Sequence, residues 1–159
     1  MYTEIRGADD MICVEDVTVR VEYLREEREG LQEAIDSAQN TLNADPENDD
    51  KADDFAEALK DMREWESDRN SELTDLDALL SELAGKGGCT EWEGEWYPSL
   101  LVNDSYFEEF ARQEAVGLGY AKDSSSWPYN CIDWERAAYL LRQDYIPVDF
   151  DGATFWYRV

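Results

Sequence analysis

Carboxylates dominate the chemistry that this sequence could perform. The 159-residue chain holds 39 Asp and Glu against 14 Lys and Arg, so its formal net charge is −25. Neighbouring acids such as Glu108 with Glu109 and Asp149 with Asp151 are of the residue types that glycoside hydrolysis or metal binding uses. In so acidic a chain these pairs arise by chance at many places, so they do not single out an active site.

Other catalytic or metal-binding patterns are missing from the sequence. It has no histidine, which is the commonest general base and metal ligand. Its three cysteines, Cys13, Cys89 and Cys131, are far apart, make neither a CxxC pair nor a zinc spacing, and suit a reduced cytosol. The glycine-rich residues 85–88 lack the spacing of a phosphate-binding loop. We therefore expect no enzymatic activity, no metal and no cofactor.

Acidic residues cluster at residues 43–54 (NADPENDDKADD). Calcium binding by an EF-hand is not predicted, since Asp50 stands where that loop needs glycine and Ala56 where it needs glutamate. Asp45 followed by Pro46 instead predicts the N-cap and first turn of a helix. The segment is therefore predicted to be the tip between two helices.

Two long helices must position most of these carboxylates. In each, apolar or long side chains recur at steps of four and three residues, which is the pattern of a coiled-coil seam. The positions are Val17, Val21, Leu24, Arg28, Leu31, Ile35, Ala38 and Leu42, and then Phe55, Leu59, Met62, Glu66, Arg69, Leu73, Leu76, Leu80 and Leu83.

A single antiparallel register, in which Leu42 faces Phe55, pairs the apolar positions of both seams. The same register stacks Arg28, Glu66 and Arg69 at mid-seam. A carboxylate between two guanidiniums there would set the register at some cost in stability.

The predicted helical pair is strongly acidic, with 23 Asp and Glu against 7 Lys and Arg between residues 15 and 83. A helix over residues 17–42 is about 39 Å long at roughly 1.5 Å per residue, which gives about one carboxylate per 1.7 Å. B-DNA carries one phosphate charge per about 1.7 Å of its axis. This density suits mimicry of duplex DNA, and it suits a well-solvated helical hairpin equally.

The fold class predicted from these patterns is α+β. The segments are an N-terminal lead-in at 1–15, a long antiparallel coiled-coil hairpin at 16–84 with Asp16 as its cap, a glycine-rich hinge at 85–90, and an acidic α+β domain at 91–159. In the lead-in, Tyr2, Ile5, Met11, Ile12 and Val14 predict a brief strand or a segment packed on the hairpin. No apolar run approaches the ~20 residues of a membrane span, so we expect a soluble protein.

The last domain is predicted to hold a strand, two helices and a terminal β-hairpin. The elements are a strand with alternating acids and aromatics at 91–97, a helix opened by a Ser105–Glu108 capping box and ended by Gly117 or Gly119, a helix at 134–142 capped by Asp133, and strands at 145–150 and 154–157 joined by an Asp151–Gly152 turn.

A resemblance appears in this domain, in the stretch YFEEFARQEAVGLGYAKDSSSWPYNCIDWERAAYLLRQDY at 106–145 and the following VDFDGATFWYRV. It resembles the C-terminal part of ArdA-type antirestriction proteins over about a third of the chain. The N-terminal hairpin departs from the first two domains of that family. The matching positions are Tyr106, Phe107, Ala111, Arg112, Glu114, Gly117, Ile132, Asp133, Trp134, Ala137 and Gly152.

Members of that family are elongated acidic proteins of phages and plasmids that mimic bent B-form DNA, occupy the DNA groove of type I restriction enzymes, and commonly dimerise. The resemblance therefore implies a non-catalytic DNA mimic in the cytoplasm of a bacterial host, and it leaves a homodimer as an open alternative. The net charge of −25 independently predicts that the chain repels nucleic acid and anionic membranes, so we expect it to bind neither. Its target would be the DNA- or RNA-binding groove of a defence complex, either a type I restriction enzyme or, given the different N-terminal half, a CRISPR effector. The predicted phosphate-mimicking residues are Asp104, Glu108, Glu109, Glu114, Asp133, Glu135, Asp144, Asp149, Asp151, Glu26, Glu29 and Glu33.

An alternative from another functional class stays open. The hairpin could belong to a coiled-coil adaptor or a phage assembly protein that binds a partner through its apolar seam or its tip. In that case the acidic residues would serve only solubility.

Overall fold

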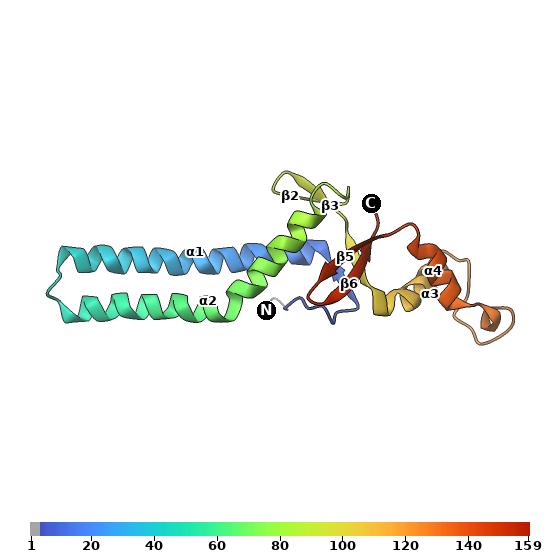
Figure 1. Cartoon of the computed structure of the whole chain (residues 1–159), viewed down its shortest axis with the longest axis horizontal. Helices are drawn as coiled ribbons and strands as arrows, with labels where there is room; N and C mark the ends of the chain where they lie inside the picture. Colours follow the sequence, from blue (N-terminus) through green and yellow to red (C-terminus); the bar gives the residue numbers. More distant parts are fainter. Residues whose placement is uncertain (1–3) are drawn as a thin grey trace. The chain divides into compact units, whose positions relative to one another are not determined.

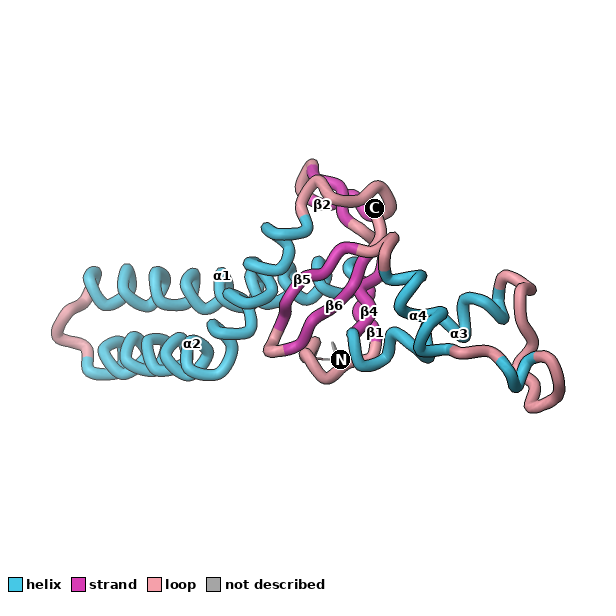
Figure 2. Tube along the Cα trace, turned by 45° about the vertical axis from the view of Figure 1, so that its right-hand side comes forward, coloured by secondary structure: helices cyan, strands magenta, loops and turns pink. Residues whose placement is uncertain are grey.

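The computed structural model describes residues 4–159, which form an α+β protein with two long helices and a small antiparallel sheet (Figures 1 and 2). Residues 1–3, with Tyr2 of the predicted lead-in, lie outside the described part. The elements are β1 (Met11–Cys13), α1 (Val14–Ala44), α2 (Asp49–Leu83), β2 (Thr90–Trp92), β3 (Glu95–Tyr97), β4 (Leu100–Asn103), the 3₁₀ helix η1 (Asp104–Tyr106), α3 (Phe107–Gly117), the 3₁₀ helix η2 (Tyr129–Cys131), α4 (Trp134–Arg142), β5 (Ile146–Phe150) and β6 (Ala153–Tyr157).

These elements divide into two compact units. One consists of residues 19–78, which are most of α1 and α2, and the other of the residues up to Thr18 together with residues 79–159. The second unit contains the sheet and the short helices. Within residues 4–159, no helix is both long enough and apolar enough to cross a membrane.

Within residues 19–78, the helices α1 and α2 lie side by side (Figure 1). Residues of the stripe that the sequence predicts are buried there. Each helix alone has few ways to shield that stripe from water, so the two stripes are buried against each other. The buried positions of the predicted seam within residues 19–78 are Val21, Leu24, Ile35, Met62, Leu73 and Leu76.

The polar stack predicted at mid-seam is wrong. Arg28 and Glu66 are exposed, whereas the neighbouring Trp65 is buried with 7% of its surface accessible. Positions 65 and 66 flank the centre line of the stripe on its two sides, so a small rotation of α2 decides which one is covered. Burying the indole removes far more apolar surface from water than burying a carboxylate would, and it avoids desolvating a charge.

The two long helices begin at other residues than predicted. Because α1 starts at Val14, Asp16 lies inside its first turn instead of capping it. The cap of α2 is Asn48, whose side-chain oxygen accepts hydrogen bonds from the backbone N–H groups of Asp50 at 3.1 Å and Lys51 at 3.4 Å. The predicted cap Asp45 instead accepts hydrogen bonds from the side chains of Asn48 and Lys51, which lower the pKa of its carboxyl.

The capping residue before α3 also differs from the prediction. Asn103 is buried, and its side-chain oxygen accepts hydrogen bonds from the backbone N–H and the hydroxyl of Ser105 at 3.1 and 2.9 Å. Its amide nitrogen donates to the carbonyls of Gly7 at 2.9 Å and Asp9 at 3.1 Å. Asn103, not a capping box at Ser105, therefore starts this segment, and α3 begins at Phe107 after the single 3₁₀ turn η1.

The sheet is antiparallel with the strand order β1-β4-β6-β5. Of the two alternatives left open for the lead-in, the structure contains the strand, β1, in which Ile12 pairs with Leu101 of β4. The terminal hairpin of β5 and β6 is also confirmed, with Asp151 and Gly152 at φ angles of 46° and 74°, as a two-residue hairpin turn requires. The predicted cap of α4 is confirmed as well, since the Asp133 carboxylate accepts a hydrogen bond from the backbone of Arg136 at 3.0 Å.

Aromatic side chains fill the core between α3, α4 and one face of the sheet. The fully buried Phe107 ring lies 5.5 Å from that of Phe110, 5.2 Å from that of Tyr145 and 6.3 Å from that of Trp156, measured between centroids. The guanidinium of Arg142 lies 4.8 Å from the Phe107 ring centroid. Phe107 is thus the central residue of this core.

The segment predicted to be a hinge is held against β3. The backbone N–H of Gly85 donates to the carbonyl of Trp96 at 2.9 Å. A Cβ at Gly87 would lie 2.1 Å from the carbonyl carbon of Tyr97, so only glycine fits there. The strand predicted at 91–97 is a hairpin of β2 and β3 instead, because the chain reverses between them at Glu93 and Gly94, both with positive φ.

Candidate acidic interaction surface

Five of the nine predicted acids in the C-terminal part bond to other groups of the chain. Asp104 accepts a hydrogen bond from the Trp156 indole at 2.8 Å and lies 3.6 Å from an Arg142 nitrogen, and Asp133 caps α4. Reversing the charge of Asp104 or Asp133 would therefore disturb the fold as well as the acidic surface. The other three contacts are Asp149 with the Thr154 hydroxyl at 2.8 Å, Asp151 with the Gly7 N–H at 2.7 Å, and Glu109 with Arg112 at 3.8 Å.

The remaining four of these acids are exposed and have no ion pair among the residues that the structure describes. Glu108 and Glu114 lie on α3, Glu135 lies on α4 and Asp144 precedes β5. They come from three parts of the unit, so they form scattered charges and not a row.

The three predicted acids of α1 belong to a longer row. Glu26, Glu29 and Glu33 are exposed, and with Glu22 and Asp36 they follow one another at steps of four and three residues along one flank of the helix. Successive carboxylates are therefore about 5 Å apart along the axis, since a mean step of 3.5 residues rises roughly 1.5 Å per residue.

A longer row of carboxylates runs along α2, and none of its residues was predicted as a site. The steps are again four and three, so the signal was present in the sequence, and five of the eight residues directly precede a position of the apolar seam. It spans about 38 Å at roughly 1.5 Å per residue. The residues are Asp50, Asp54, Glu57, Asp61, Glu64, Asp68, Glu72 and Asp75, of which all but Glu72 are exposed.

Contacts between the helices show that the two rows lie on opposite faces of the pair. On one side of the seam, an Arg25 nitrogen lies 2.8 Å from an oxygen of Asp77. On the other side, the Trp65 indole N–H donates to Glu27 at 3.2 Å. At 100° per residue, the α1 row lies on the outer side of α1 toward the flank of Arg25, and the α2 row lies on the flank of Trp65. We call these sides the Arg25 face and the Trp65 face.

Few cations neutralise the α2 row. Glu64 lies 3.6 Å from Lys60 one turn away, and Glu72 forms a nearly buried pair with Arg20. The other six acids have no ion pair within residues 4–159. These six are Asp50, Asp54, Glu57, Asp61, Asp68 and Asp75, and their uncompensated charge makes the row attractive to a basic partner.

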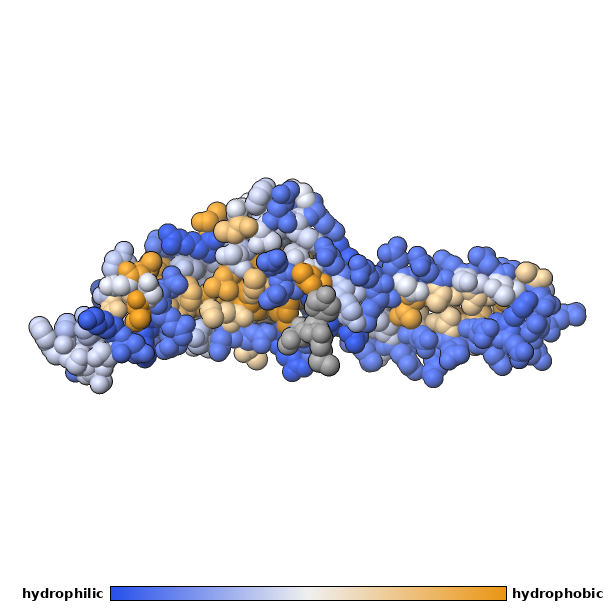
Figure 3. All heavy atoms as spheres, turned by 180° about the vertical axis from the view of Figure 1, so that it is seen from behind, coloured by the Kyte–Doolittle hydropathy of each residue, from blue (hydrophilic) through white to orange (hydrophobic). Residues whose placement is uncertain are grey.

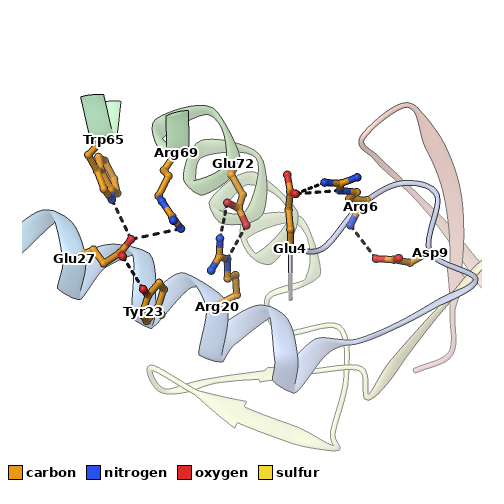
Figure 4. Close-up of polar contacts among 9 residues, drawn as sticks. All are labelled: Glu4, Arg6, Asp9, Arg20, Tyr23, Glu27, Trp65, Arg69 and Glu72. Atoms are coloured by element: carbon orange, nitrogen blue, oxygen red, sulfur yellow. Dashed lines mark hydrogen bonds and ion pairs between the residues drawn. The ribbon is translucent and has the colours of Figure 1, made fainter. Parts of the chain in front are cut away.

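A polar network on the Trp65 face joins α1 to α2 (Figure 4). Glu27 accepts a hydrogen bond from the Tyr23 hydroxyl at 2.6 Å as well as from Trp65, and lies 3.6 Å from Arg69. The hydrogen bond to Glu27 raises the pKa of the Tyr23 phenol, because it stabilises the protonated form. One carboxylate therefore links both helices, together with the buried tryptophan.

The pair of Arg20 and Glu72 adds a second link between the helices. The guanidinium donates two hydrogen bonds to the carboxylate, at 2.7 and 2.8 Å. These hydrogen bonds raise the pKa of Arg20. Two parallel hydrogen bonds between a guanidinium and a carboxylate make a strong ion pair, so this pair fixes the orientation of the Glu72 carboxylate within the α2 row.

Replacing Glu27 with alanine is expected to lower the free energy of unfolding by about 1–3 kcal/mol, because the partly buried Trp65 and Tyr23 donors lose their acceptor. The matched control is Glu26→Ala, one residue away and exposed, for which we expect a change within about 0.5 kcal/mol. Urea unfolding followed by circular dichroism measures both. Equal stabilities of the two variants would show that the network contributes nothing.

A shallow pocket of about 270 Å³ lies beside Arg112, with Lys122, Ser124 and Tyr129 in its lining. The Arg112 guanidinium is already paired with Asp123 at 2.8 Å, so it does not offer an uncompensated cation. Within residues 4–159, no three Cys, Asp or Glu side chains are grouped so that they could hold a metal ion.

Comparison of the chain with family models, curated proteins and solved structures found no match.

Proposed function

We propose that this protein is a non-catalytic DNA mimic that occupies the DNA- or RNA-binding groove of a host defence complex. The observation that supports the proposal best is the pair of carboxylate rows on opposite faces of α1 and α2. A DNA duplex likewise carries its charge in two rows, one phosphate per about 3.4 Å of axis on each strand. The carboxylate rows are sparser, at about 5 Å per charge along each helix.

Carboxylates can take the place of phosphates because both accept charge-assisted hydrogen bonds from Arg and Lys. A net charge of −25 also accelerates the encounter with a basic groove and repels nucleic acid itself. We propose that α1 and α2 pack as an antiparallel coiled coil, which keeps the two rows at constant separation.

The resemblance of residues 106–145 to ArdA-type antirestriction proteins supports the choice of target. A type I restriction enzyme is the first candidate and a CRISPR effector the second. By the same resemblance we propose action in the cytoplasm of a bacterial host, with a homodimer as the form to test first.

Three charge-reversal variants of equal net charge test the proposal. One changes Glu26, Glu29 and Glu33 to Lys, a second Asp54, Glu57 and Asp61, and a third the scattered acids Glu108, Glu114 and Glu135. Asp104 is left unchanged because its carboxylate accepts a hydrogen bond from the Trp156 indole. The readout is displacement of labelled duplex DNA from a purified type I restriction enzyme at several salt concentrations.

We expect the parent protein to displace DNA with an affinity that falls steeply with salt, and each row variant to lose at least about tenfold more affinity than the scattered-acid variant. Circular dichroism must show that all three variants are folded. Equal losses in all three would mean that net charge, not the rows, matters. Binding of DNA and this protein together, or undiminished displacement by both row variants, would rule out mimicry and leave the adaptor hypothesis.

A further inference from the structure

Apolar side chains in and directly beside the seam stay partly uncovered on the Trp65 face of the helical pair. Toward the tip, Leu31, Ala38, Phe55 and Ala58 are only half-buried, and Ala34 is exposed. We call these five residues the apolar stripe, and Figure 3 shows it between hydrophilic borders. Leu24 and Leu76 of the same seam, further from the tip, are by contrast fully buried.

The α1 side of the stripe is built of small residues. Gly30, Ala34, Ser37 and Thr41 follow one another at steps of four, three and four. A Cβ at Gly30 would meet no atom within 4 Å, so packing inside this chain does not explain a glycine in the middle of the helix. Small side chains do allow another backbone to approach closely, so the stripe is accessible to a second element.

The α2 side of the stripe is the acidic row. The Asp54, Asp61 and Asp68 carboxylates border the stripe and have no ion pair among the described residues. Two cations of the α2 segment are engaged elsewhere, Lys51 with Asp45 and Arg69 with Glu27. The apolar stripe and the acidic row beside it together form a surface, here called the groove, that combines uncovered apolar side chains with uncompensated negative charge along its α2 side.

The negative charge along the α2 side of the groove determines which kind of partner can bind there. A second copy of this chain laid on the groove would place its own carboxylates against these carboxylates, and like charges at an interface oppose association. A helix with apolar residues on one face can bury them on the apolar stripe, and Lys or Arg on its flank can pair with the acidic row. From Gly30 to Thr41 the groove extends about 17 Å at roughly 1.5 Å per residue, which is three helical turns.

We infer that the apolar stripe and the acidic row of the Trp65 face form a docking groove for a basic amphipathic helix of a partner protein. This inference does not depend on DNA mimicry, because the apolar stripe has no counterpart in a phosphate backbone. It assigns the Trp65 face to a helix that buries its apolar residues on Ala34, Ala38 and Ala58 while its basic residues meet Asp54, Asp61 and Asp68.

The test uses the full chain and a fluorescein-labelled synthetic peptide of about 18 residues, with Leu and Ala on one helical face and Lys on the other. A scrambled peptide of the same composition has the same charge without the apolar face. Two variants alter the groove: Ala34→Arg adds bulk and positive charge, and Gly30→Gln adds bulk without charge. The control is Ala56→Arg, an exposed alanine on the Arg25 side of α2.

By fluorescence anisotropy, we expect the amphipathic peptide to bind at least about tenfold tighter than the scrambled one. Ala34→Arg and Gly30→Gln should each weaken it at least about fivefold, and Ala56→Arg less than about twofold. Since Gly30→Gln raises helix propensity, its loss of binding cannot come from unfolding.

Equal binding of both peptides, or equal weakening by Ala34→Arg and Ala56→Arg, would show that charge alone acts and would overturn the inference. An absence of peptide binding would also overturn the inference. A dimer in sedimentation that Ala34→Arg dissociates would overturn it too, because the groove would then bind a second copy of the chain. Reversal of Glu26, Glu29 and Glu33, on the other face, tests mimicry, so the two proposals fail separately.

Discussion

Replacing Phe107 with alanine is expected to lower the free energy of unfolding of the unit that contains the sheet by about 3–5 kcal/mol. The ring is fully buried and contacts the rings of Phe110, Tyr145 and Trp156. Its removal leaves a cavity among rigid aromatic neighbours, which cannot collapse to fill it. It also removes the surface on which the Arg142 guanidinium lies.

The control for Phe107→Ala is Tyr120→Ala, an aromatic side chain of the same unit that is 82% exposed. We expect this change to alter stability by less than about 0.5 kcal/mol. Thermal and urea unfolding, followed by near-ultraviolet circular dichroism of the aromatic core, measure both variants. A Phe107→Ala protein as stable as the control would contradict the core described for this unit.

Replacing Leu24 with alanine is expected to cost about 2–5 kcal/mol in the unit formed by the two long helices. Leu24 is fully buried and Leu73 is 4% exposed, so Leu73→Ala should have an effect of the same size. Helical hairpins of this composition gain most of their stability from the buried stripe, because an isolated acidic helix is marginal in water.

Glu33→Ala provides the comparison for these two variants. Glu33 is exposed on the α1 row, so we expect a change below about 0.5 kcal/mol. Far-ultraviolet circular dichroism during urea unfolding reports the loss of α1 and α2. If Leu24→Ala and Glu33→Ala unfold at the same urea concentration, the two helices do not stabilise each other through the predicted seam.

Both proposals about function depend on this helical pair. The carboxylate rows need a rigid support to act like a phosphate backbone, and the docking groove needs α1 and α2 at a fixed separation. A destabilised pair would lose both properties together. For this reason the charge and groove variants change exposed or open positions only, whereas the core variants measure the support itself.

The amino-acid sequence by itself determined the features that depend on neighbours along the chain. The steps of four and three located the packed stripe of α1 and α2, because helical periodicity places such residues on one side whatever they pack against. Asp133 as the cap of α4 and the Asp151–Gly152 turn were likewise predictable, since both depend on local backbone geometry.

Only the tertiary structure decided the features that join distant residues. Asn103 became the cap before α3 because its amide also bonds to Gly7, 96 residues away, and no local pattern contains that partner. Trp65 and not Glu66 is buried in the seam, because the rotation of α2 is determined by how much apolar surface it buries against α1 and not by the spacing of residues alone.

The same distinction applies to the acidic surface. The sequence shows that carboxylates recur along both helices, but periodicity alone does not say which flank of one helix meets which flank of the other. The contacts of Arg25 with Asp77 and of Glu27 with Trp65 settle this for the folded pair. They put the two rows on opposite faces and leave the apolar stripe beside only one of them, because side chains from two elements share a surface only once those elements are packed.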